Sequence, residues 1–153
     1  MKILVSACLL GENCKYSGGN NYNQAVCDFA RGHQVVPVCP EVLGGLPTPR
    51  CPAEIVQGVV TNKEGINVDR EFRAGAAKAL AIAKENEVEL AILQSRSPSC
   101  GVKEIYDGTF SGTKIPGQGV FAKMLMDEGI RVLDAGELPK IILKNEDGKC
   151  QSN

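Results

Sequence analysis

The strongest constraint on the fold of this chain is the alternation of short apolar runs, rich in Val, Ile and Leu, with stretches of helical periodicity. The predicted buried strands are residues 2–7, 34–38, 89–95 and 130–133, and the predicted helices are 22–32, 68–88 and 119–129. Strands that alternate with helices are typical of βαβ units on a parallel sheet. We therefore expect an α/β fold: a single-domain, open, mainly parallel sheet flanked by helices in a Rossmann-like three-layer sandwich.

Three further segments complete the predicted organisation. Residues 39–52, "CPEVLGGLPTPRCP", contain four prolines and two glycines, which favour a long loop over a helix. Residues 53–68 alternate enough to form a small hairpin or an extended excursion. The segment after Pro139 is expected to be only loosely attached. The chain is thus divided into one domain, residues 1–138, and a C-terminal tail, residues 139–153.

Composition and charge narrow the classes of partner. The 153 residues are 43% hydrophobic and 23% charged, with a formal net charge of -1, which suits a globular domain with a real core. A binder of large nucleic acids would normally show a basic surplus, so such a partner is not expected, although a small nucleotide or base fits. The first residues are too short an apolar run for a signal peptide, and no run approaches the ~20 residues of a membrane span. We expect a cytoplasmic protein without a membrane partner.

Cysteine placement gives the main functional signal. The chain has seven cysteines, and an odd count without a secretion signal argues against a disulfide framework. Cys27 lies on a predicted helix beside apolar residues, as expected of a packed thiol. In contrast, Cys8, Cys39 and Cys100 each follow a predicted strand. Because the carboxyl ends of parallel strands share one edge of a sheet, these three thiols are expected to meet there.

Several kinds of site could use three convergent thiols. A structural zinc usually takes four ligands, often in CxxC pairs, and no CxxC occurs in the sequence. Iron–sulfur clusters prefer thiolates, and ligation by three cysteines leaves one iron open to another ligand. From spacing alone, a cluster, buried thiols and an oxidoreductase disulfide all remain open. His33, the only histidine, is expected at the surface rather than as a ligand.

Polar residues close to the thiols are candidates for proton transfer and binding. Glu41 follows Cys39 by two residues and could share its pocket, or it could simply start a helix or face solvent. The serines of "SPSCG", Ser97 and Ser99, could act on protons, although loop serines more often satisfy turn backbone. Arg50 could hold an oxygen or phosphate of a substrate, or pair with the nearby Glu54.

Four motifs carry a resemblance to a known family. "SACLLGENCKYSGG", "VCPEVLGGLPTPRCPAEI", "SRSPSCG" and "GQGVFAKML" resemble, in this order, segments of the bacterial and archaeal domain of unknown function 523 family, some members of which are thiouracil desulfidases. The match spans residues 1–133. It implies a small α/β fold with a [4Fe–4S] cluster held by only three cysteines. It also implies non-redox removal of sulfur from a thiolated pyrimidine of the thiouracil or thiouridine type, with the open iron binding the departing sulfur.

The resemblance also assigns roles to residues of this chain. It implies that the cluster ligands are Cys8, Cys39 and Cys100, and that the catalytic residues are Glu41 and Ser97. Water deprotonated by Glu41 would attack the thiocarbonyl carbon, while Ser97 would orient or relay a proton and the iron would act as a Lewis acid.

Some positions leave alternatives or depart from the family pattern. Cys14 and Cys51 could compete with Cys39 as ligands, and Cys51 stands where the family has a variable or apolar residue. Arg50 and Arg96 are the candidate substrate-binding residues. Arg96 replaces a lysine of the family pattern, which keeps the charge and changes its geometry.

Three other functions compete with a desulfidase that acts on a small molecule. The main alternative is an iron–sulfur or zinc protein that carries or senses without turnover. A second is an enzyme acting on thiolated transfer RNA, for which Lys15, Arg50 and Arg96 could form a local basic patch. A thiol oxidoreductase using Cys8 and Cys14 has less support, because their spacing is not that of a CxxC motif.

Overall fold

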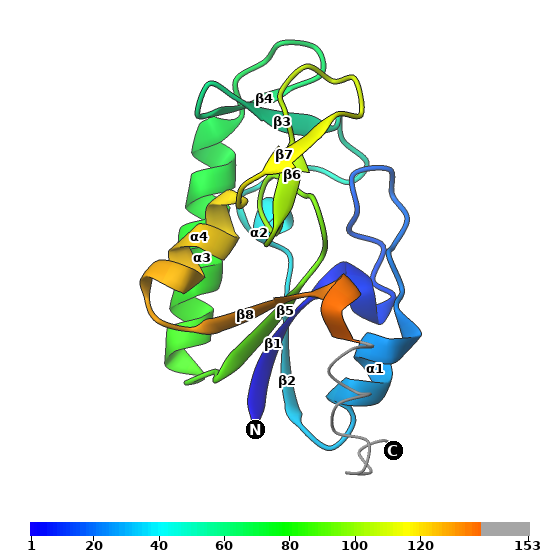
Figure 1. The fold of residues 1–153 in the computed structure, drawn as a ribbon, viewed down its shortest axis with the longest axis vertical. Coiled ribbons are helices and arrows are strands. Elements are labelled where there is room, and N and C mark those ends of the chain that lie inside the picture. The colour runs from blue at the N-terminus through cyan, green and yellow to red at the C-terminus, as the bar shows by residue number, and fades with distance from the viewer. Residues whose placement is uncertain (139–153) are drawn as a thin grey trace.

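Four parallel strands form the central sheet, in the order β2–β1–β5–β8 (Figure 1). In chain order they are β1 (Lys2–Ser6), β2 (Gln34–Val38), β5 (Leu90–Leu93) and β8 (Arg131–Asp134). The computed structural model describes residues 1–138; the predicted tail, residues 139–153 with Cys150, lies outside the described residues.

Side chains at alternate positions of the strands point to opposite faces of the sheet and pack into two separate hydrophobic cores. On β1, Ile3 and Val5 face one side of the sheet, and Leu4 faces the other. The first side is covered by α1 (Gln24–Ala30) and the 3₁₀ helices η1 (Ala7–Leu10) and η2 (Ala135–Glu137). The second is covered by α3 (Asp69–Glu85) and α4 (Val120–Asp127) (Figure 1). Burial of both faces explains the continuous apolar runs of the strands, and the predicted three-layer α/β fold is confirmed.

One prediction about local structure is wrong. The stretch expected to be a loop throughout contains the one-turn helix α2 (Pro40–Leu43). Proline is well suited to the first position of a helix, where its missing N–H costs nothing, and Glu41 in the first turn complements the helix dipole. The abundance of prolines therefore concealed a short helix start.

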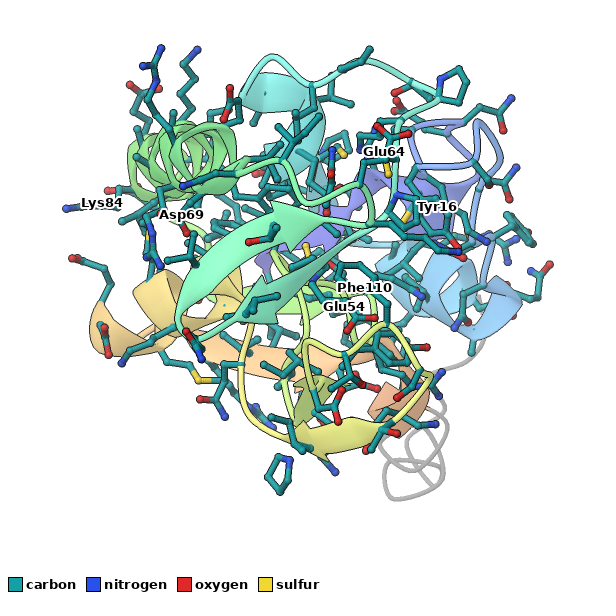
Figure 2. All side chains as sticks on the ribbon, turned by 90° about the horizontal axis from the view of Figure 1, so that it is seen from above. Tyr16, Glu54, Glu64, Asp69, Lys84 and Phe110 are labelled. Atoms are coloured by element: carbon teal, nitrogen blue, oxygen red, sulfur yellow. The ribbon has the colours of Figure 1, made fainter. Side chains whose placement is uncertain are left out.

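Two hairpins lie beyond the carboxyl ends of the parallel strands, at the top of Figure 1. The predicted hairpin is β3 (Ala53–Val56) with β4 (Val59–Asn62). A second hairpin, β6 (Glu104–Tyr106) with β7 (Lys114–Pro116), was not predicted. One carboxylate oxygen of Glu54 on β3 accepts hydrogen bonds from the backbone N–H groups of Gly108 (2.9 Å) and Phe110 (3.1 Å) in the second hairpin. Figure 2 shows Glu54 beside Phe110, and this contact joins the two hairpins.

Among residues 1–138, no helix combines the length and the apolar character needed to cross a lipid bilayer.

Candidate functional site

A cavity of about 520 Å³ opens at the carboxyl ends of the parallel strands, below the two hairpins. Five cysteines line it: Cys8, Cys14, Cys39, Cys51 and Cys100. The structure thus brings together the three cysteines expected to meet, and adds two that follow no strand directly. Its volume falls within the range of about 300–1,000 Å³ that is usual for ligand sites.

The ends of three strands position the three predicted ligands. Cys8 lies in η1, directly after β1. Cys39 follows β2 and is the N-cap residue of α2. Cys100 lies in the loop after β5, where Ser97 Oγ accepts hydrogen bonds from the backbone N–H groups of Ser99 (3.0 Å) and Cys100 (2.9 Å). This local bonding folds "SPSCG" into a tight turn.

The start of α4 holds that turn from outside. The N–H of Val120 donates to the carbonyl oxygen of Pro98 (2.8 Å), and the N–H of Phe121 donates to that of Ser99 (2.9 Å). A side chain at Gly119 would collide with the carbonyl group of Ser99, so the close approach requires glycine. The "GQGVFAKML" motif therefore supports the loop that carries Cys100.

Cys8, Cys14 and Cys39 form one interacting group of thiols. Hydrogen bonding from the Cys14 side chain lowers the pKa of Cys8, and the amide of Asn21 assists at 3.4 Å from Cys8 Sγ. The same contact from Cys14 lowers the pKa of Cys39 to about 7. As the donor to both, Cys14 has a raised pKa. Cys8 and Cys39 are consequently predisposed to be thiolates, the form that binds metals.

Cys100 has a different environment. Its residue is 4% exposed, and burial raises the pKa of its thiol to about 12, although a hydrogen bond from Ser6 opposes this shift. The distance from Ser99 Oγ to Cys100 Sγ is 3.6 Å. A positive partner would be needed to keep a thiolate in this position, and a bound metal supplies that charge.

Glu41 is held by both carboxylate oxygens. Its Oε1 accepts hydrogen bonds from Arg50 Nε (3.1 Å) and Nη2 (2.9 Å). Its Oε2 accepts one from Ser99 Oγ (2.9 Å). The position of Glu41 in the first turn of α2, beside Cys39, places this fixed carboxylate in the thiol-lined cavity.

The two serines of the turn form a directed hydrogen-bond chain. Ser97 Oγ already accepts from two backbone N–H groups, so in its 2.8 Å contact with Ser99 Oγ it is the donor. Ser99 then donates its own hydrogen to Glu41. The chain runs from Ser97 through Ser99 to Glu41. Sequence reasoning favoured a turn-stabilising role for Ser99, and its place beside a predicted ligand was the one signal for more.

Arg50, a predicted substrate-binding residue, has all of its donors engaged. Besides Glu41, its guanidinium donates to the carbonyl oxygens of Pro47 (3.2 Å) and Cys14 (2.9 Å) and to Thr48 Oγ1 (3.0 Å). These bonds account for its five N–H groups, and its side chain is only 7% exposed. The alternative pairing with Glu54 is wrong, since Arg50 pairs with Glu41.

The other predicted residues occupy more peripheral positions. Arg96 lines the cavity with its side chain 45% exposed, and forms an ion pair with Glu104 at 3.3 Å. It is therefore accessible to a bound molecule, as a substrate-binding residue must be. His33 stacks on Phe29 with ring centroids 5.0 Å apart and does not line this cavity. Cys27 lies outside the cavity and donates to the carbonyl oxygen of Leu9.

The donor set fits a cluster better than a single ion. In the part of the chain that the structure describes, no three His, Cys, Asp or Glu side chains are arranged to hold one metal ion. The ligands of an iron–sulfur cluster each bind a different iron, so they surround the group instead of converging on one point. Thiols distributed around a cavity match that requirement, and their softness suits iron and sulfide.

Fold and site together define a parallel α/β protein with a thiol-lined cavity at its strand ends. The 2-thiouracil desulfurase family matches residues 3–137. The chain belongs to this family of enzymes, which confirms the resemblance seen in the motifs.

Two individual relatives are similar over nearly the whole chain. The uncharacterized protein YbbK of Bacillus subtilis (strain 168) is 42% identical over 150 residues, covering 92% of this chain and 99% of its own length. A solved structure, that of the [4Fe-4S]-dependent thiouracil desulfidase TudS (DUF523Vcz), matches with a TM-score of 0.84 and 39% identity, covering 95% of this chain and 97% of TudS.

Proposed function

We propose that this protein is a non-redox desulfidase that replaces the sulfur of a thiolated pyrimidine with oxygen, using a [4Fe–4S] cluster held by Cys8, Cys39 and Cys100. The observation that carries the proposal is the meeting of these three thiols with a doubly held carboxylate, Glu41, in one cavity. The similarity to the [4Fe-4S]-dependent desulfidase TudS supports the same assignment.

The cofactor and the protein contribute different parts of the chemistry. When bound, the cluster would supply one iron without a protein ligand as a Lewis acid for the sulfur of the substrate. Glu41 supplies the base. Its Oε1 accepts two hydrogen bonds from Arg50 and its Oε2 accepts one from Ser99, which leaves one lone-pair position on Oε2 for a water molecule.

The reaction needs no electron transfer. A water oxygen attacks the thiocarbonyl carbon as its proton passes to Glu41, and the carbon–sulfur bond breaks to leave a carbonyl group and hydrosulfide. Ser97 and Ser99 hold Glu41 in place, because Ser97 donates to Ser99 and Ser99 donates to the carboxylate. Arg96 at the accessible side of the cavity is the residue we expect to contact the rest of the substrate.

The test begins with anaerobic reconstitution of the cluster, followed by iron and sulfide analysis. Loss of thiocarbonyl absorbance is then followed with thiouracil, thiouridine and their nucleotides as substrates. Glu41→Gln removes the base but keeps the size of the side chain, so we expect the cluster to be retained and kcat to fall by about 10²–10⁴.

Other outcomes identify other functions. Full activity in Glu41→Gln would contradict the role of this carboxylate. A wild-type protein that binds iron and sulfide but turns over none of these substrates would indicate a carrier or sensor. Turnover restricted to thiolated transfer RNA would indicate the RNA-directed alternative.

A further inference from the structure

Cys14 is a fourth thiol in the site, and the proposed mechanism does not use it. It lines the same cavity as Cys8 and Cys39, two of the three proposed ligands, and its carbonyl oxygen lies 3.8 Å from Cys39 Sγ. Cys51 lines the same cavity, but among residues 1–138 no hydrogen bond joins it to Cys8 or Cys39. The position of Cys14 therefore differs from that of a cysteine that merely lies nearby.

The backbone around Cys14 is anchored to the same two ligands. The loop that carries it leaves and returns at Cys8, whose carbonyl oxygen accepts hydrogen bonds from the N–H groups of Gly11 (3.2 Å) and Asn21 (3.0 Å). The carbonyl oxygen of Cys14 accepts a hydrogen bond from Arg50 Nη2 at 2.9 Å and contacts Cys39 Sγ at 3.8 Å. The backbone around Cys14 is thus tethered to both Cys8 and Cys39, and the residue lines the cavity.

We propose that Cys14 is an exchangeable fourth ligand: its thiolate binds the iron that Cys8, Cys39 and Cys100 leave open, and the sulfur of the substrate displaces it. This inference rests on the proposed function. Formation of the iron–sulfur bond releases the thiol proton to water, and displacement returns a proton to the thiol, so no electron is transferred. A soft thiolate is the ligand that a soft substrate sulfur replaces at least cost.

The consequence is a cluster that is fully ligated at rest. Removal of Cys14 leaves the fourth iron exposed and more easily lost on oxidation, when a [4Fe–4S] cluster becomes a [3Fe–4S] cluster. In Cys14→Ala, the substrate no longer has to displace a protein ligand, so the KM of this variant for the substrate falls.

The test compares reconstituted wild type, Cys14→Ala and the matched control Cys51→Ala. Iron and sulfide analysis establishes loading, Mössbauer spectra of ⁵⁷Fe show whether one iron differs from the others, and electron paramagnetic resonance follows [3Fe–4S] formation after ferricyanide addition. We expect wild type and Cys51→Ala to show a distinct iron only after thiouracil is added. Cys14→Ala should show it without substrate and should lose its fourth iron about 10-fold faster or more.

Each outcome decides between the two proposals. If Cys14→Ala matches wild type in Mössbauer spectrum and oxidation rate, Cys14 is not a ligand, while the desulfidase proposal stands. If Cys14→Ala binds no cluster, Cys14 is an obligatory ligand and the exchange is wrong. If wild type itself binds no four-iron cluster, the proposed function fails first.

Discussion

Arg50 acts in this site by fixing its neighbours. Its guanidinium joins the carboxylate of Glu41 to the carbonyl oxygen of Cys14, and both side chains of the ion pair are largely buried, at 7% and 14% exposure. A lysine could not reproduce this arrangement, because an ammonium group has three donors and lacks the planar fork of arginine. At the scale of single residues, the site therefore depends on Arg50, whose guanidinium has no N–H group left to bind a substrate.

Arg50→Ala should consequently destabilise the protein and only secondarily affect substrate binding. Breaking a buried ion pair leaves Glu41 uncompensated, so we expect a loss of about 3–5 kcal/mol in the free energy of unfolding, measured by urea titration. The control is Arg96→Ala, which removes an exposed ion pair and should cost less than about 1 kcal/mol while raising KM. Normal stability with a raised KM in Arg50→Ala would instead show that Arg50 binds substrate.

At the scale of elements, α2 carries both Cys39 and Glu41, and its position depends on two glycines. α2 and α3 approach so closely that a side chain on Gly75 of α3 would collide with the carbonyl oxygen of Pro40. A side chain on Gly44, which ends α2, would collide with the backbone carbonyl oxygen of Glu71. Glycine in the middle of a helix is unfavourable by about 0.5–1 kcal/mol, and this contact explains its presence in α3.

Gly75→Ala is therefore expected to impair the site from a distance. The added methyl group must push α2 away from α3. Cys39 and Glu41 are then both displaced with α2, and the protein loses about 1–3 kcal/mol of stability. Iron content after reconstitution and kcat should both fall. Gly19→Ala is the control, because its side chain would meet only Ser17 Oγ, at an ordinary 3.6 Å. Unchanged iron binding in Gly75→Ala would show that α2 can move without harm to the site.

The sequence predicted the elements whose signal is local and missed those that depend on distant partners. The strand at residues 34–38 has the predicted bounds, because its apolar pattern and its flanking residues define it alone. The hairpin of β6 and β7 has strands of only three residues, too short for a periodic signal. The meeting of three thiols was predicted because each follows a strand of a parallel sheet, whose carboxyl ends share one edge. The hydrogen bonds that fix Glu41 could not be predicted from the sequence, because Arg50 and Ser99 reach Glu41 only through tertiary folding.

At the scale of the whole molecule, the two hairpins lie beyond the carboxyl ends of the parallel strands (Figure 1), and residues of both line the cavity. Tyr106 and Phe110 of the second hairpin and Ala53 and Glu54 of the first contribute to the cavity wall. Glu54 joins the hairpins through the hydrogen bonds described above, so its carboxylate contributes to how well they close over the site.

Glu54→Ala should therefore make a bound cluster more sensitive to air. Loss of the shared acceptor lets the hairpins separate and admits oxygen, while the sheet and its two cores remain intact. The measurement is the decay of the visible absorbance of the reconstituted protein in aerated buffer, which we expect to be several-fold faster, on the order of a 1 kcal/mol change in hairpin opening. Glu64→Ala, in the exposed turn that follows β4 (Figure 2), is the control and should decay like wild type. Equal decay rates would mean that the hairpins do not limit access.

The origin of the three proposed ligands after three different strands also constrains the order of assembly during biosynthesis. Cys8 and Cys100 meet only once β1 has paired with β5, and Cys39 joins them through the pairing of β1 with β2. Parallel pairings between distant segments form late compared with local structure. A nascent chain therefore has no complete set of ligands until β5 has left the ribosome and the sheet has closed. Delivery of the proposed cluster would therefore follow tertiary folding, and the brown colour of a loaded cluster would serve as a visible marker of the native sheet.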